Sequence, residues 1–97
     1  MELTFSIQQD DYAFYIGKVP TCGICQTAYL MLQKLEPLFP KITFYEFNLN
    51  FAKDLVRNLE ISNMPVFIIS QKGVIKDVFY DFTFTKLALK LAKMEEE

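Results

Sequence analysis

The sequence predicts an α/β fold in which helices cover a central sheet of about four strands. Strand-like runs alternate with helix-like segments in the order β-α-β-α-β-β-α, which is the pattern of a layered α/β domain. Hydrophobic residues make up 52% of the 97 residues, and ten Phe and five Tyr provide ample material for a core. Because this length suits a single core, we expect residues 1–97 to form one domain.

The first half of the chain predicts a strand, a helix and a second strand. Residues 12–17 form a short apolar and aromatic run after a polar segment, which is typical of a buried strand. From residue 23 to residue 38, apolar side chains recur at intervals of three and four, which predicts a helix. Residues 42–49 are rich in aromatic and β-branched side chains, so a second strand is expected there.

The second half predicts a short helix, a hairpin and a terminal helix. Asn50 can cap a helix over residues 51–59, in which apolar side chains fall four apart. Residues 66–69 and 74–80 are strand-like, and a glycine in the short loop between them indicates a hairpin. From Phe84 onward the apolar spacing is helical and lysines occupy the other side, which predicts an amphipathic helix.

Residues 3–9 are ambiguous between a strand and a helix. Leu3, Phe5 and Ile7 alternate with other residues as they would in a strand, whereas Thr4 could cap one short helical turn. We expect the helical turn.

Composition also bears on location and partners. Because the net charge is −2, we expect no nucleic-acid ligand. The longest charge-free stretch, residues 19–33, contains Pro, Gly, Thr and Gln, so we expect no membrane association. The acidic N-terminus has no cation before Lys18 and does not match a secretory signal, so we expect a cytoplasmic protein. With no His and two Cys, one chain cannot supply a classical zinc site.

Cys22 and Cys25 lie at the junction between the first strand and the first long helix. The unpaired N–H groups and the positive dipole end of a helix stabilise a thiolate at Cys22, which lowers its pKa. Cys25 follows three residues later, close enough to resolve a mixed disulfide. The position of the pair therefore predicts thiol–disulfide exchange.

Three other interpretations of the cysteine pair remain open. The thiols could be inert core residues, they could form a purely stabilising disulfide, or two chains could each donate a pair to a metal. A bridge that closes so short a loop removes little unfolded-state entropy, and stabilising disulfides are rare in the cytosol. The alternative to an enzyme is therefore a binding or assembly module with a non-catalytic or metal-bridging pair.

Residues 12–94 resemble the thioredoxin superfamily. The family's redox motif, its cis-proline segment, its hairpin glycine and its central strand all have counterparts here. They are Cys22-Gly23-Ile24-Cys25, Asn63-Met64-Pro65-Val66-Phe67, Gly73 and residues 42–50, respectively.

The resemblance implies a thioredoxin-like fold with a mixed central sheet, and a thiol–disulfide oxidoreductase that needs no bound cofactor. Cys22 would attack the substrate disulfide and Cys25 would release the reduced product. Thr21, Met64 and Pro65 would contact the substrate chain. We expect disulfide-containing protein substrates, an upstream reductase as electron donor, and a monomer.

The chain also departs from the family pattern. Thr21 replaces the usual Trp, and the strand before the motif lacks the family's buried acid. We also expect an abbreviated N-terminus, because few residues precede the first predicted strand. Glu46 stands where the resemblance would put a lysine, and we propose it as a substitute base that takes the proton from Cys25. The alternative is that Glu46 reaches solvent or pairs with a lysine.

Overall fold

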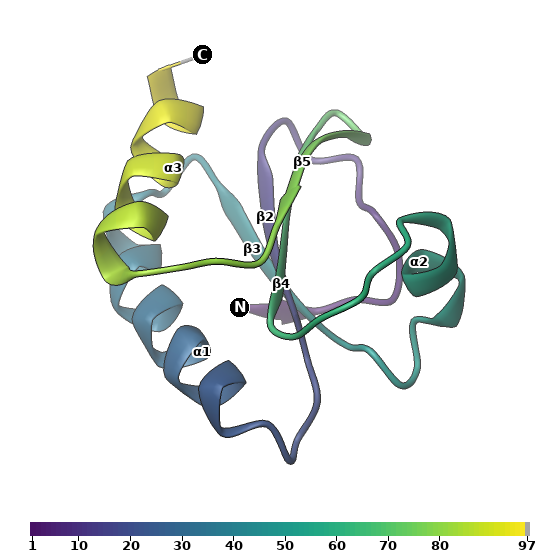
Figure 1. The fold of residues 1–97 in the computed structure, drawn as a ribbon. Coiled ribbons are helices and arrows are strands. Elements are labelled where there is room, and N and C mark those ends of the chain that lie inside the picture. The colour runs from purple at the N-terminus through teal and green to yellow at the C-terminus, as the bar shows by residue number, and fades with distance from the viewer. Residues whose placement is uncertain (97) are drawn as a thin grey trace.

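The computed structural model describes residues 1–96, which form one mixed sheet with helices on both faces (Figure 1). The strand order is β1-β3-β2-β4-β5. β1 and β2 run parallel to β3, whereas β4 is antiparallel to both β2 and β5. The strands are β1 (Glu2–Leu3), β2 (Ala13–Lys18), β3 (Thr43–Asn48), β4 (Val66–Gln71) and β5 (Val74–Phe79). The predicted mixed sheet is confirmed, with the two-residue β1 added to the four expected strands.

The helices divide between the two faces of the sheet. α1 (Gly23–Leu35) and α3 (Phe84–Glu96) cover one face, and α2 (Lys53–Asn58) covers the other (Figure 1). A 3₁₀ turn, Glu36–Leu38, extends α1 to the end of the helix that the sequence predicts. No helix within residues 1–96 is long and apolar enough to cross a membrane.

Each face of the sheet carries its own hydrophobic core because side chains alternate along the strands. Phe14 packs with α1 and α3, and its neighbour Tyr15 packs on the α2 face; both are 0% exposed. The Tyr15 hydroxyl lies 2.9 Å from Ser70 Oγ and accepts a hydrogen bond from the Gln8 backbone N–H at 2.9 Å. This buried hydroxyl ties the N-terminal segment to the sheet.

The prediction of a helical turn within residues 3–9 is wrong. Leu3 belongs to β1, and no residue from Thr4 to Gln9 is helical. The Thr4 N–H donates to the Glu46 carbonyl at 2.9 Å, so the chain at Thr4 is held along the edge of β3.

Asn50 is not the cap of α2. The helix begins at Lys53 after Ala52, and no side chain caps it. Asn48 organises this connection instead, because its Oδ1 accepts from the Asn50 N–H at 2.8 Å and its carbonyl accepts from the Ala52 N–H at 3.1 Å.

The hairpin between β4 and β5 is confirmed. Lys72 and Gly73 have φ values of 51° and 82°, and two successive positive values are typical of a tight hairpin turn. β4 and β5 pair so that Phe67 lies opposite Phe79. The end of β5 therefore returns to the start of β4.

Candidate active site

Cys22 and Cys25 form a disulfide at the start of α1, with 5.2 Å between their Cα atoms. Cys22 is the N-cap residue, in an extended conformation with φ −91° and ψ 107°. Its Sγ accepts a hydrogen bond from the Cys25 backbone N–H at 3.2 Å. The helix start that the sequence predicts is therefore confirmed, and the Cys22 sulfur points at the free N–H groups of that helix.

The two cysteines differ in burial. Cys25 is one turn into α1, where it is 0% exposed and continues the buried stripe of Ala28 and Leu32. Cys22 stands outside this stripe and is partly exposed. The disulfide can be approached from solvent at Cys22 and is shielded at Cys25.

The loop before β4 brings Met64 and Pro65 to the cysteine motif. The Met64–Pro65 peptide bond is cis, Pro65 is buried and Met64 is 40% exposed. Ile24, which lies between the cysteines, faces the same surface hollow of about 250 Å³. We call this the disulfide hollow; it is lined by Ile24, Asn63, Met64, Pro65, Tyr80, Asp81 and Phe82.

Thr21 is exposed beside Cys22 and does not line this hollow. Tyr80, Asp81 and Phe82 do line it, and the sequence analysis did not identify them. The register of the hairpin was the available signal, because pairing Phe67 with Phe79 puts the residues after β5 next to those before β4.

A small polar cluster lies at the ends of β2 and β3 on the α1 side. Lys18 Nζ is 3.1 Å from Glu46 Oε1, and the two side chains are 25% and 21% exposed. The same ammonium lies 5.0 Å from the centroid of the Tyr29 ring. Burial and the neighbouring Glu46 carboxylate raise the pKa of Tyr29 above its ordinary value. Glu46 therefore pairs with a lysine, as the alternative in the sequence analysis has it.

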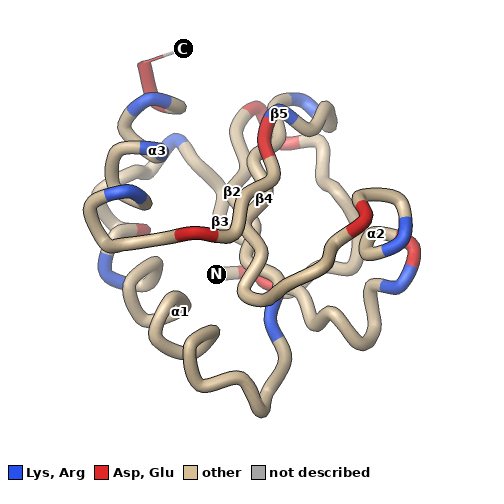
Figure 2. Tube along the Cα trace, in the orientation of Figure 1, with Lys and Arg blue, Asp and Glu red and all other residues tan. Residues whose placement is uncertain are grey.

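The chain around the two cysteines carries no charge, and Asp81 is the charged residue that lines the disulfide hollow. No charged residue occurs between Lys18 and Lys34. In Figure 2 the loop before α1 and most of that helix are therefore tan, the colour of residues without charge. Within residues 1–96 no three potential metal ligands gather into one group. The Cys22 and Cys25 sulfurs are the reactive groups that this segment supplies.

Comparisons with known proteins agree with this site. The thioredoxin family profile matches residues 12–93. The thioredoxin-like protein YusE of Bacillus subtilis is 28% identical over 89 residues, which are 92% of this chain and 83% of that protein.

Solved structures of thioredoxins share the fold. Mitochondrial thioredoxin 3 of Saccharomyces cerevisiae, in its oxidised form, aligns with a TM-score of 0.86 at 19% identity, covering 96% of this chain and 94% of that one. Plasmodium falciparum thioredoxin aligns with a TM-score of 0.86 at 16% identity, covering 96% and 98%. Since the family match spans both cysteines and the cis-proline, the chain belongs to the thioredoxin family and is a thiol–disulfide oxidoreductase.

Proposed function

We propose that this protein reduces disulfide bonds in other proteins by exchange through Cys22 and Cys25. The observation that carries the proposal is the placement of the pair, with a partly exposed sulfur at the helix N-terminus and a buried one behind it. In the reduced protein the N–H groups and dipole of α1 stabilise the thiolate form of Cys22.

The exchange takes place in two steps. The Cys22 thiolate attacks one sulfur of the substrate disulfide, and the other substrate sulfur leaves as a thiolate that takes up a proton. Cys25 then loses its proton and attacks the Cys22 sulfur, which releases the first substrate sulfur. The substrate gains two electrons and two protons, and the Cys22–Cys25 disulfide seen in the structure is the oxidised product.

Thr21, Met64 and Pro65 are the proposed contacts for the substrate chain. Met64 and Pro65 line the disulfide hollow, where an extended segment can lie beside the start of β4. Thr21 is exposed next to Cys22, where it can touch the residue beside the substrate cysteine.

The electron supply follows from the chemistry of the cycle. Because the oxidised pair must be reduced after each turnover, we propose an upstream dithiol reductase as donor and no bound cofactor. We place the protein in the cytoplasm as a monomer, where the thiol pool favours reduction.

Dithiothreitol-dependent reduction of insulin by the purified protein tests the proposal. Precipitation of the insulin B chain should accelerate with the wild type and should not accelerate with Cys22→Ser. No acceleration, together with a metal that copurifies in proportion to the cysteine pairs, would instead support a metal-bridging module.

A further inference from the structure

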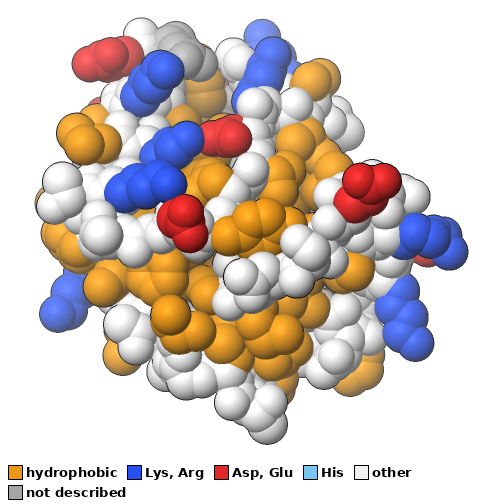
Figure 3. All heavy atoms as spheres, in the orientation of Figure 1, with side chains coloured by type: hydrophobic (Ala, Val, Ile, Leu, Met, Phe, Trp, Pro, Cys, Tyr) orange, Lys and Arg blue, Asp and Glu red, His pale blue; other side chains and the backbone are white. Residues whose placement is uncertain are grey.

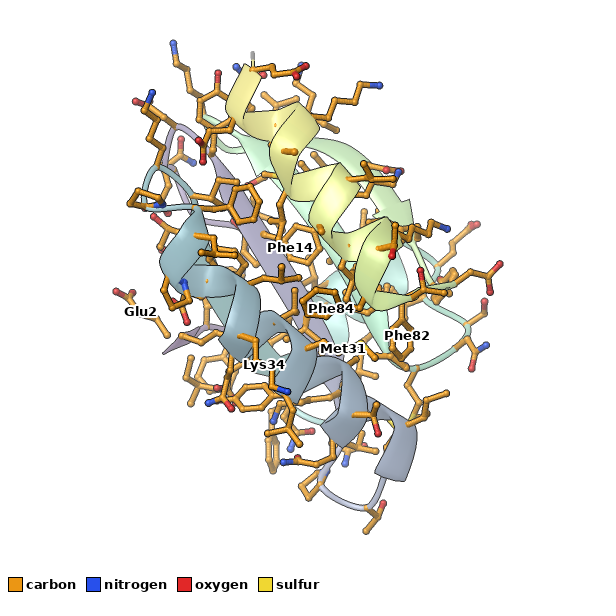
Figure 4. All side chains as sticks on the ribbon, turned by 90° about the vertical axis from the view of Figure 1, so that its left-hand side faces the viewer. Glu2, Phe14, Met31, Lys34, Phe82 and Phe84 are labelled. Atoms are coloured by element: carbon orange, nitrogen blue, oxygen red, sulfur yellow. A yellow bond between two sulfur atoms is a disulfide. The ribbon has the colours of Figure 1, made fainter. Side chains whose placement is uncertain are left out.

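A second hollow lies further along the exposed side of α1. We call it the α1–α3 groove; it has a volume of about 300 Å³ and is lined by Thr27, Leu30, Met31, Lys34 and Phe84. Ile24, Thr27 and Met31 follow one another at helical spacing, so both hollows lie on one side of α1. Figure 4 shows Met31 and Phe84 meeting between the two helices, with Phe82 near the start of α3.

The surface formed by the two hollows is strongly apolar. Ile24 is 58% exposed, Leu30 49% and Phe84 44%, and Met64 adds its 40% exposed side chain at the other end. In Figure 3, hydrophobic side chains gather across the lower centre of the visible face, and basic side chains follow one another along α3 above them. Large exposed apolar side chains gathered in this way mark an interaction surface.

The two ends of this surface carry opposite charges. Asp81 lines the disulfide hollow, whereas Lys34 lines the groove. Among the described residues Lys34 forms no ion pair. Its ammonium group therefore remains available to an acidic partner.

We infer that the α1–α3 groove binds the segment of a protein substrate that flanks its reactive cysteine, with apolar residues in the groove and an acidic residue facing Lys34. This inference rests on the proposed function, and the charge of Lys34 selects the acidic residue. A helix rises about 1.5 Å per residue, so the surface from Cys22 to Lys34 is about 18 Å long. An extended chain covers that length in about five or six residues.

Peptides with one cysteine, disulfide-bonded to thionitrobenzoate, provide the probe. Attack by Cys22 on the peptide sulfur forms the mixed disulfide and releases coloured thionitrobenzoate, so the rate reports docking of the peptide. In each peptide an apolar spacer separates the cysteine from Glu, Gln or Lys, placed at the fifth and sixth positions from the cysteine. In one series these residues lie on the carboxyl side of the cysteine, and in another they lie on its amino side.

In one of the two series, the Glu peptide should react about two- to fivefold faster than the Gln peptide and the Lys peptide should react slowest. High salt should remove the advantage. Lys34→Gln should reduce it, whereas Lys53→Gln, on α2 across the sheet, should leave it intact. Equal rates for the three peptides in both series would overturn the inference.

The apolar part has a matched test. Phe84→Ser and Leu30→Ser should slow the reaction of the apolar peptide, whereas Phe51→Ser, at a side chain that is 71% exposed and outside the groove, should not. Unchanged rates with the first two variants would remove the groove from substrate binding. A dimer of the wild type that Phe84→Ser abolishes would assign the groove to a second copy and overturn the inference.

Reduction of hydroxyethyl disulfide separates this inference from the proposed function. The molecule is too small to reach the groove, so every variant named here should reduce it at the rate of the wild type. If the wild type reduces it and the peptides show no preference, the docking inference alone fails. If the wild type does not reduce it, the proposed function fails.

Discussion

The sulfur of Cys22 accepts a hydrogen bond from the backbone N–H of Cys25, with 3.2 Å between Sγ and N. The two residues are therefore connected by the helix cap as well as by their disulfide. When the disulfide is reduced, the same N–H can donate to a thiolate at Cys22, and it cannot do so for the buried Cys25 sulfur. One local arrangement thus distinguishes the nucleophile from the resolving thiol.

Alkylation of the reduced protein near neutral pH should label Cys22 before Cys25. Cys22 is the partly exposed thiol at the helix N-terminus, and Cys25 is 0% exposed. Peptide mapping at short reaction times checks the order, and earlier labelling of Cys25 would contradict the assignment. In addition, Cys25→Ser should accumulate mixed disulfides through Cys22, because no thiol remains to resolve them.

Gly17→Ala should destabilise the protein by about 1–3 kcal/mol because the core has no room for the added methyl group. A Cβ at this position in β2 would lie 2.6 Å from both Phe47 Cζ and Val66 Cγ1. Urea denaturation of the oxidised protein measures the effect. Gly23→Ala is the matched control, since nothing lies within 4 Å of its added Cβ and the residue starts a helix. Equal stability of the two variants would refute the packing argument.

Local patterns were sufficient for most of the fold. The helical spacing of Cys25, Ala28 and Leu32 predicts α1, and a glycine between two strand-like runs predicts the hairpin. The N-terminal strand could not be predicted in the same way, because its pairing depends on β3, which is distant in the sequence. The start of α2 was missed for a related reason, since Asn48 and not Asn50 organises the turn before it.

The cysteine motif and the cis-proline segment could be identified from the sequence, but their surroundings could not. The contribution of Tyr80, Asp81 and Phe82 to the disulfide hollow follows from the hairpin register, which residue spacing alone does not specify. The partner of Glu46 also depends on register. Ile16 lies opposite Glu46, so Lys18, two residues further along β2, reaches it diagonally on the same face.

Tyr45→Phe should lower the stability of the protein at neutral pH. In alkali the variant should lose less of its stability than the wild type does. The Tyr45 hydroxyl donates to Asp10 Oδ1 at 2.5 Å, and the side chain is 6% exposed. Burial and Asp10 together raise the pKa of Tyr45. The folded state therefore holds this proton more tightly than the unfolded state. The stabilisation by the Tyr45 hydroxyl is present below about pH 10 and is lost as pH rises above it.

Removing the hydroxyl should cost about 1.5–3 kcal/mol at neutral pH, because the acceptor is a carboxylate. Denaturation of the wild type and of Tyr45→Phe at a series of pH values measures both effects. Above pH 10 the free energy of unfolding should fall less steeply in the variant, although Tyr29, whose pKa is also raised, keeps part of the slope. The same slope in both proteins would exclude Tyr45 as its source.

Glu46→Gln tests whether a carboxylate takes the proton that Cys25 must lose before it attacks the mixed disulfide. Glu46 faces the α1 side of the sheet, but its carboxylate is 3.1 Å from Lys18 Nζ. Accepting a proton would remove the charge that attracts Lys18, which opposes the transfer. We therefore expect water to be the proton acceptor.

Stopped-flow measurement of mixed-disulfide resolution across a range of pH decides between Glu46 and water. The Glu46→Gln variant should resolve the mixed disulfide within about twofold of the wild-type rate, with the same pH profile, and should lose less than about 1 kcal/mol of stability because the ion pair is partly exposed. Lys18→Met removes the other partner and serves as the control. If Glu46→Gln slows resolution at neutral pH and the rate recovers in alkali, while Lys18→Met resolves normally, then Glu46 is the base: hydroxide would be replacing the missing carboxylate, which a purely structural ion pair could not explain.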